Sequence, residues 1–481
     1  MATVEPVNFD LWPWQYWRQR SPNATAIVLE QQNITWRELC DHVSIAQQQL
    51  VNHFVHLQIC ALQVGLVESS AHPPLSIQRI AINSDGRYEN FIIMLASWQQ
   101  GWQTLMLNSA LSQSERAILF KQVGIDAFFS LDVFPLHFAI ENKRNQEFAL
   151  YKPVFDKNTF LTLTLTSGSS DLPKAVVHSA RHHLASATGL LHILPYVSDD
   201  CWLLSLPLFH VSGLAIVWRW LSIGARLKIA EIKGDRLISA IEGVTHASFV
   251  PPQLQRVLNS KLSTSLHSVL LGGVSISQAL VDEAEYKGIQ CWCGYGMTEM
   301  ASTITAKRAD GRFTVGNVLP NRALYLTESG EVLVKGETLS PGYMVGGVLQ
   351  ALNADWLATK DKGQWCKTSC ELQLIGRLDN MFICGGENVQ PEAVERMLSV
   401  YPKLTQVIIL PVEDGRWGSV PIAIVKGNID FDVFLHWAQT QVPAYQCPVL
   451  ALQLPEDIGQ SGIKLSRKAL ADWLAKQVLS F

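Results

Sequence analysis

The chain has no excess of positive charge. Its 481 residues include 38 Lys and Arg against 42 Asp and Glu, which gives a net charge of −4. Proteins that bind nucleic acid or anionic membranes usually carry a basic patch, so neither partner is indicated. Only 17% of the residues are charged and 48% are hydrophobic, which excludes a disordered chain. The composition favours a folded protein with a large core and a small-molecule partner.

Long apolar runs are also missing. The most apolar window, WLLSLPLFHVSGLAIVWRWL, is broken by Pro207, His210, Gly213 and Arg219. No uninterrupted run reaches the roughly 18 residues that a membrane span needs. The N-terminal MATVEPVNFDLWPWQYW has no basic flank before an apolar core, so no signal peptide is predicted. We expect a soluble cytoplasmic protein, and the sequence leaves open whether it forms a homo-oligomer.

Cysteine pairs with metal-ligand spacing are absent. The nine cysteines are odd in number and scattered, and none forms a CxxC pair. Cys366 and Cys370 are four residues apart, but no second pair or neighbouring histidine completes a zinc site. We interpret the cysteines as reduced, mostly buried thiols.

The order of apolar and helical segments predicts the fold. Thr35 and Glu38 in ITWRELCDHV have the pattern of a capping box at a helix start. Beyond them, β-rich runs alternate with helical stretches, which predicts an α/β fold with parallel sheets. The β-rich runs are FIIML, DAFFSL, FLTLTLT, WLLSLPL, RLKIAEI and SVLLGG. The helical stretches are SARHHLASATGLLHIL, PPQLQRVLNS and SQALVDEAEYKG.

The local sequence pattern changes twice towards the C-terminus. From about Arg312, short strands and turns predict a β-rich subdomain. Beyond Asn380, Pro391 stands where a first helical turn would begin in QPEAVERMLSV. We therefore predict a large domain of α/β subdomains plus a β-rich subdomain over residues 1–378, and a small α/β domain over residues 379–481.

A loop rich in Ser and Gly follows the run FLTLTLT. Its hydroxyls, backbone N–H groups and one lysine could all bind phosphate oxygens. The candidates are Thr166, Ser167, Gly168, Ser169, Ser170 and Lys174. The loop does not fit the Walker pattern GxxxxGK[ST]. Taken alone, such a loop is more often a plain connection.

The order [Ser/Thr]-Ser-Gly-Ser-x-x-x-Pro-Lys resembles the phosphate loop of the acyl-adenylate-forming superfamily, which includes acyl-CoA ligases, peptide-synthetase adenylation domains and luciferases. Further motifs follow in the family's order. They are PLFH, GYGMTE, WLATKDKG, GRLDNMFICGGENVQPEAVE and GIKLSRKAL. Because these motifs span most of the chain, it is identified as a member. The resemblance implies ATP-dependent activation of an acid through an acyl-adenylate, with Mg²⁺ as cofactor and CoA as co-substrate.

The resemblance also implies the catalytic roles. The acid's carboxylate and the α-phosphate of ATP are both anions, so their reaction needs cations that neutralise the developing charge. Glu299 would ligate Mg²⁺, Thr298 would donate to the α-phosphate, and Lys464 would bridge carboxylate and phosphate oxygens. Outside the family register, Lys464 would be an ordinary surface lysine and Glu299 a carboxylate at a helix start.

For the nucleotide, the resemblance places Tyr295 on the adenine face and Asp361 on the ribose hydroxyls beside Arg377. A competing triplet, residues 368–370, lacks the carboxylate that would accept from both hydroxyls. The alternatives without nucleotide binding are that Asp361 is a turn residue and that Tyr295 is a core residue.

For the second half-reaction, the resemblance implies that the small terminal domain is mobile. Asp379 would be its hinge, and Gly385 and Gly386 would line the pantetheine tunnel of CoA. A simple tight turn is the alternative for this glycine pair.

The acyl pocket is the least defined part. SLPLFHVSGLAIVWRWL, CGYGMTEMAST and GIKLSRKAL most resemble CoA ligases whose acid has an aryl ring, a keto group and a second carboxylate. Such an acid favours a cation and hydroxyl donors. The substrate-binding candidates are His210, Ser212, Arg219, Gly272 and Gly273. The alternatives are that Arg219 lies on a helix surface and that the two glycines merely end a strand. A ligase for another acid, or an adenylating enzyme that feeds a carrier protein, also stays open as the function.

Asp171 departs from the family's loop, which usually has Gly there. At roughly 6 Å and an effective dielectric near 20, its repulsion with the triphosphate costs on the order of 2–3 kcal/mol before screening. We predict that Asp171→Gly lowers the KM for ATP in steady-state assays at saturating acid and CoA. An unchanged or higher KM would count against this repulsion.

Overall fold

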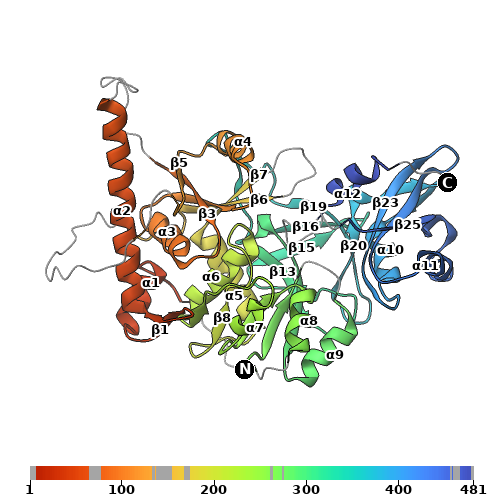
Figure 1. Ribbon diagram of the computed structural model, residues 1–481, viewed down its shortest axis with the longest axis horizontal. Helices are drawn as coiled ribbons and strands as arrows, with labels where there is room; N and C mark the ends of the chain where they lie inside the picture. The colour runs from red at the N-terminus through yellow and green to blue at the C-terminus, as the bar shows by residue number, and fades with distance from the viewer. Residues whose placement is uncertain are drawn as a thin grey trace.

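The computed structural model describes residues 7–63, 77–132, 136, 154–166, 174–260, 264–272, 276–455, 458 and 466–477. Helix α2 (Trp36–Gln63) runs along one side of the molecule, and the strands and helices of the C-terminal hundred residues lie at the opposite end (Figure 1). No helix in these ranges is long and apolar enough to cross a bilayer.

The first sheet has a parallel centre extended by antiparallel strands. Its order is β18-β17-β7-β6-β4-β3-β5. Strands β3, β4, β5 and β6 pair in parallel, whereas β7, β17 and β18 pair antiparallel. The strand bounds are β3 Arg79–Ser84, β4 Gln103–Asn108, β5 Ala127–Phe129, β6 Phe160–Thr166, β7 Lys174–Ser179, β17 Gly342–Val345 and β18 Val348–Ala351.

The second sheet follows the order β14-β13-β12-β11-β10-β8-β9-β1-β2. The strands from β12 to β1 in this order pair in parallel, and β2, β13 and β14 are antiparallel additions at the two ends. The bounds are β1 Thr25–Val28, β2 Asn33–Thr35, β8 Cys201–Leu203, β9 Arg226–Lys228, β10 His246–Phe249, β11 Ser268–Leu271, β12 Gln290–Met297, β13 Ser302–Arg308 and β14 Asn317–Val318.

Helices connect and cover these two sheets. They are α1 Pro13–Arg20, α3 Tyr88–Gln99, α4 Gln113–Val123, α5 Ala180–Leu191, α6 Val211–Ile223, α7 Arg236–Ala240, α8 Pro251–Asn259 and α9 Gln278–Tyr286. The predicted capping box is confirmed at the start of α2, where Thr35 N donates to Glu38 Oε2 at 2.8 Å and Glu38 N donates to Thr35 Oγ1 at 3.2 Å.

One strand prediction is wrong. The run FIIML lies inside helix α3, of which all residues but the half-buried Glu89 are buried. Trp98 of α3 stacks on Trp218 of α6 with ring centroids 5.3 Å apart, in a core shared by several helices. A helix enclosed on all sides is apolar all round, so its sequence has no amphipathic period that would distinguish it from a strand.

The predicted β-rich segment is confirmed by a third, antiparallel sheet of order β15-β16-β19-β20. Its strands are β15 Arg322–Leu326, β16 Glu331–Gly336, β19 Leu357–Trp365 and β20 Leu372–Arg377. Its buried side chains pack with those around Tyr295 and Met300, at the end of β12. The third sheet therefore adjoins the end of the second.

The C-terminal segment has its own sheet and cores. Strands β21 Phe382–Cys384, β22 Glu387–Val389, β23 Leu404–Asp414, β24 Gly418–Gly427 and β25 Leu450–Gln453 form the sheet. Helices α10 Pro391–Leu398 and α11 Phe431–Ala438 contribute to one apolar cluster and α12 Arg467–Leu474 to another. Helix α10 begins at Pro391 as predicted. The α/β class is confirmed, and the domain division at residue 378 stays a prediction.

Candidate active site

Three predicted nucleotide-binding side chains meet where the second and third sheets adjoin. Tyr295 in β12 donates its hydroxyl to Asp361 Oδ2 at 2.5 Å. Asp361 in β19 lies opposite Arg377 in the register of β19 and β20, and Arg377 Nη1 lies 3.5 Å from Asp361 Oδ1. The carboxylate is thus oriented by a hydroxyl on one oxygen and a guanidinium on the other. Burial, followed by the neighbouring Asp361, raises the pKa of Tyr295 well above its usual value, so this hydroxyl stays protonated.

A local turn fixes Asp361. Its backbone N–H donates to Thr359 Oγ1 at 3.0 Å, and that hydroxyl donates to Val332 O of the neighbouring strand at 2.9 Å. Between them, Lys360 adopts a φ of +63°. The segment Thr359–Asp361, rather than the competing triplet at residues 368–370, therefore brings a carboxylate to Tyr295 and Arg377.

Glu299 links the first and second sheets. It belongs to the short 3₁₀ helix Thr298–Met300 directly after β12, and Tyr343 of β17 donates its hydroxyl to Glu299 Oε1 at 3.1 Å. Ser340 N donates to the main-chain oxygen of Glu299 at 2.7 Å. Lys174 Nζ lies 5.2 Å from the ring centroid of Tyr343. The Glu299 carboxylate, the Tyr343 phenol and the Lys174 amine, from three separate elements, therefore lie in a row in space. Thr298 is next to Glu299 in the chain.

The Ser/Gly loop is defined by its two ends. Thr166 and Lys174 face each other at the ends of the antiparallel strands β6 and β7. Several predicted site residues lie outside the described residues. They are Ser167, Gly168, Ser169, Ser170, Gly273 and Lys464.

Arg219 is the most unusual of the acyl-pocket candidates. Helix α6 begins after His210, carries Ser212 in its first turn and places Arg219 two turns further on. Arg219 is only 2% exposed, so the alternative of an arginine on the helix surface is wrong. Its Cζ lies 5.3 Å from the ring centroid of Trp202, and Nε has no hydrogen-bond partner among the described residues.

The charge of Arg219 is also unpaired within the described chain, where no acidic side chain forms a salt bridge with it. Burial, and then repulsion from Arg322, lowers the pKa of Arg219 to about 9. A buried cation without a partner is costly, so this arrangement fits a site that receives an anion.

The remaining acyl candidates border α6 and β11. Burial lowers the pKa of His210, and its Nε2 has no partner among the described residues. Gly272 directly follows β11, and a Cβ built there would meet no atom of the described residues within 4 Å. This free space beside the backbone is what a pocket-lining glycine requires.

The predicted hinge is held by a bidentate ion pair. Arg377 Nε and Nη2 donate to the two carboxylate oxygens of Asp379, each at 2.8 Å. This hydrogen bonding raises the pKa of Arg377 and lowers that of Asp379. Gly385 and Gly386 have φ of +59° and +88° in the turn between β21 and β22, so both occupy the left-handed region that favours glycine.

Comparison with known proteins identifies the family. Residues 76–344 match the family model described as AMP-binding enzyme. The 2-succinylbenzoate–CoA ligase of Escherichia coli (strain K12) is 38% identical, over 98% of this chain and 99% of that protein. The chain belongs to the AMP-binding enzyme family. The predicted membership of the acyl-adenylate-forming enzymes is confirmed, as is a full-length resemblance to 2-succinylbenzoate–CoA ligases.

Solved structures agree with this assignment. A variant of E. coli MenE with bound OSB-AMS has a TM-score of 0.82 and 34% identity, covering 98% of this chain and all of that one. MenE from Bacillus subtilis in complex with ATP and magnesium ion has a TM-score of 0.75 at 23% identity, covering 94% of this chain and 96% of that one, and it supports the fold.

Two residues that act on predicted site residues of this AMP-binding enzyme escaped the sequence analysis. Tyr343 contacts Glu299 from another sheet, and no local pattern distinguishes it from a core tyrosine. Arg322 is buried near Arg219, donates to Pro320 O at 2.9 Å, and burial lowers its pKa to about 10. Neither could be found locally, because Tyr343 and Glu299 belong to different sheets and Arg322 and Arg219 are more than a hundred residues apart in the chain.

A cavity of about 570 Å³ lies elsewhere on this AMP-binding enzyme. Its lining includes Trp292, Leu319 and Arg322 and contains none of the predicted site residues. The nucleotide residues instead surround the carboxyl end of β12, which is where parallel α/β sheets place their ligands.

Proposed function

We propose that this AMP-binding enzyme is an ATP-dependent acid–CoA ligase for 2-succinylbenzoate, acting in menaquinone biosynthesis. It would form 2-succinylbenzoyl-CoA, AMP and diphosphate. The full-length similarity to the E. coli ligase and the OSB-AMS bound by E. coli MenE support this acid. In this chain, the observation that carries the proposal is buried Arg219, a cation without an acidic partner among the described residues.

The position of Arg219 suits an acid with two carboxylates. It lies seven residues beyond Ser212 on α6, which corresponds to about 10 Å of helix. One carboxylate of the acid could pair with the guanidinium while the other faces the nucleotide. Pairing would also compensate the buried charge, so the binding of this acid would relieve an unfavourable feature of the free enzyme.

Adenylation joins the second carboxylate to the α-phosphorus of ATP with loss of diphosphate. Asp361, held by Tyr295 and Arg377, would bind the ribose and fix the position of the α-phosphate. Lys464 would neutralise the carboxylate and phosphate oxygens as they approach. The thiol of CoA then attacks the acyl carbonyl and AMP leaves, which gives the thioester.

Glu299 fits a magnesium site. Its Oε1 accepts the Tyr343 hydroxyl, and the described residues give its other oxygen no hydrogen bond. Mg²⁺ prefers carboxylate and phosphate oxygens, so Glu299 would hold it beside the triphosphate. When bound, the ion neutralises charge on the phosphates.

Tyr343→Phe should weaken magnesium binding, because the Glu299 carboxylate loses the hydroxyl that orients it. We expect the Mg²⁺ concentration for half-maximal activity to rise about tenfold or more, with the KM for the acid little changed. A magnesium titration at fixed total ATP measures this. Exposed Tyr325→Phe is the matched control. An unchanged magnesium titration for Tyr343→Phe would show that its hydroxyl does not position Glu299.

The function itself is tested by thioester formation. Purified enzyme is incubated with ATP, Mg²⁺, CoA and either 2-succinylbenzoate, benzoate or a medium-chain fatty acid, and acyl-CoA is quantified by mass spectrometry. We expect efficient product only from 2-succinylbenzoate. Preference for another acid would replace the proposed substrate, and acid-dependent diphosphate release without any CoA product would indicate a carrier-protein acceptor.

A further inference from the structure

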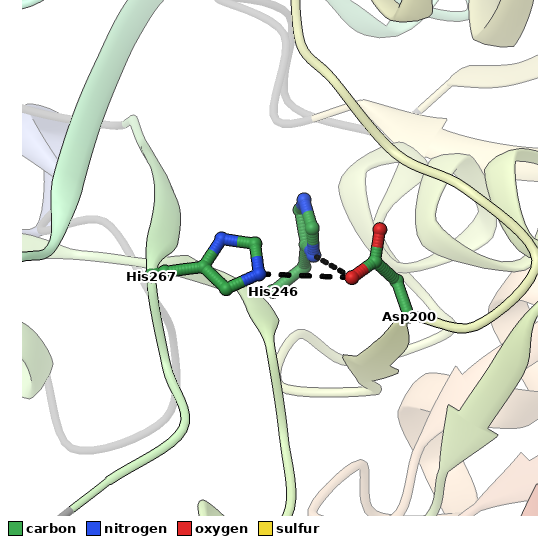
Figure 2. A group of neighbouring side chains, drawn as sticks. All are labelled: Asp200, His246 and His267. Atoms are coloured by element: carbon green, nitrogen blue, oxygen red, sulfur yellow. Dashed lines mark ion pairs between the residues drawn. The ribbon is translucent and has the colours of Figure 1, made fainter.

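Three side chains able to bind a metal gather at the amino ends of neighbouring parallel strands. Asp200 precedes β8, His246 begins β10 and His267 precedes β11, and the sheet order places β10 between the other two. One ligand atom of each lies within 4.8 Å of the others. Figure 2 shows both imidazoles directed at the Asp200 carboxylate. We propose that Asp200, His246 and His267 form a zinc site.

Two of the three distances between ligand atoms are close to those of a zinc site, and the third is at most 4.8 Å. Asp200 Oδ1 lies 3.6 Å from His267 Nε2 and 3.9 Å from His246 Nδ1. Bonds of about 2.0–2.1 Å in a tetrahedral arrangement separate ligand atoms by about 3.3–3.4 Å. His267 precedes its strand and its side chain is 53% exposed, so it can move the small distance that closes the site.

The buried histidine is already oriented as a ligand. His246 Nε2 contacts Pro195 O at 2.8 Å, which requires the proton on Nε2 and leaves a lone pair on Nδ1, the atom nearer Asp200. A main-chain carbonyl that holds the far nitrogen is a usual arrangement around metal-bound histidine. The ring also packs against Tyr196 and Trp202, which restricts its rotation.

One hydroxyl competes for the Nδ1 lone pair and has another partner. Thr245 Oγ1 lies 2.8 Å from His246 Nδ1, but it also lies 3.2 Å from Cys201 O. If the hydroxyl proton turns to the carbonyl, Nδ1 becomes free without leaving the threonine unsatisfied. Without a proton or cation between them, the Nδ1 lone pair and the Asp200 carboxylate face each other unfavourably. A metal ion bound between these two groups would remove this unfavourable contact.

The ligand types select the metal. Two imidazoles and one carboxylate suit Zn²⁺, whereas Mg²⁺ and Ca²⁺ prefer oxygen ligands throughout. Exposed His267 leaves the fourth position open to water. Gly272 follows the same strand that His267 precedes and lies about 17 Å of strand away, whereas Arg219 and His246 both pack against Trp202. Zinc here would connect the starts of three strands and take no part in the formation of the acyl-adenylate or the thioester.

The test uses full-length enzyme stripped of metal with a chelator and titrated with ZnCl₂ by calorimetry. We expect one tight site per chain. His267→Ala and Asp200→Asn should each weaken it at least about tenfold. His436→Ala, which removes an exposed histidine of α11, should bind zinc as the wild type does. Zinc should raise the melting temperature of the wild type and not that of His267→Ala.

Two further readouts decide the site. His267→Ala should keep magnesium-dependent thioester formation, which shows that it is folded. Co²⁺ in place of zinc should give absorption bands of nitrogen and oxygen ligands. The proposal is overturned if the wild type takes up no zinc, if His267→Ala binds it equally tightly, or if cobalt shows sulfur charge-transfer bands, which would place the metal on cysteines.

Discussion

Lys464→Ala is expected to slow acyl-adenylate formation by about 10²–10³-fold, the loss typical when one preorganised charge or donor is removed from a transition state. Lys464 lies in GIKLSRKAL, two residues before Ser466, whose side chain caps α12 by accepting from Ala469 N at 3.2 Å. The amine would bring two anionic oxygens together, and no described residue is assigned this role. Substrate binding depends mainly on other groups, so the KM for ATP should change less than the rate.

Rapid-quench measurement of acyl-adenylate at saturating ATP and 2-succinylbenzoate follows this step directly. Lys476→Ala, which removes an exposed lysine after the same helix, is the control and should keep the wild-type rate. Supplied with synthetic acyl-adenylate and CoA, Lys464→Ala should still form thioester. If it makes acyl-adenylate as fast as the wild type, the assigned role of Lys464 is wrong.

Arg219→Met should raise the KM for 2-succinylbenzoate by roughly ten- to hundredfold, because a hydrogen bond to a charged group contributes about 1.5–3 kcal/mol. The KM for ATP should stay nearly constant, since the nucleotide residues lie at the end of β12. The same change should raise the melting temperature of the free enzyme, because it removes a buried, unpaired cation and keeps a side chain of similar length.

Steady-state kinetics and thermal unfolding of the same preparations separate the two effects. Arg181→Met on α5 changes an exposed arginine and should alter neither quantity. A lower melting temperature together with an unchanged acid KM would mean that Arg219 supports the core and does not bind the acid. For Arg219→Met, the affinity for the acid is expected to fall while the thermal stability is expected to rise, and this combination distinguishes acid binding from a role in the core.

Local sequence patterns predicted the elements that depend on local physics. The capping box at Thr35 and the helix start at Pro391 are confirmed, because both require only neighbouring residues. The alternation of strands and helices likewise predicted the α/β class. Helix α3 was missed because its surroundings, and not its own pattern, decide its conformation: an apolar run such as FIIML fits a buried strand or a buried helix equally well.

In the candidate site, too, short motifs predicted some residues, and others depend on how distant strands pair. The motif register predicted Asp361 and Arg377, and the pairing of β19 with β20 brings them together. Tyr343 and the His246–His267 pair were not predicted, because their positions depend on which strands become neighbours and in which register. Such information is not contained in any short stretch of sequence. The resemblance supplied the roles of Glu299 and Lys464, and these remain to be measured.

The most direct test of the whole account is acid-dependent exchange between ATP and labelled pyrophosphate by the wild-type enzyme without CoA. The account predicts rapid exchange with 2-succinylbenzoate and Mg²⁺, and little with benzoate, because a reversible acyl-adenylate forms before the thiol is needed. Thioester formation from 2-succinylbenzoate without any such exchange would contradict it.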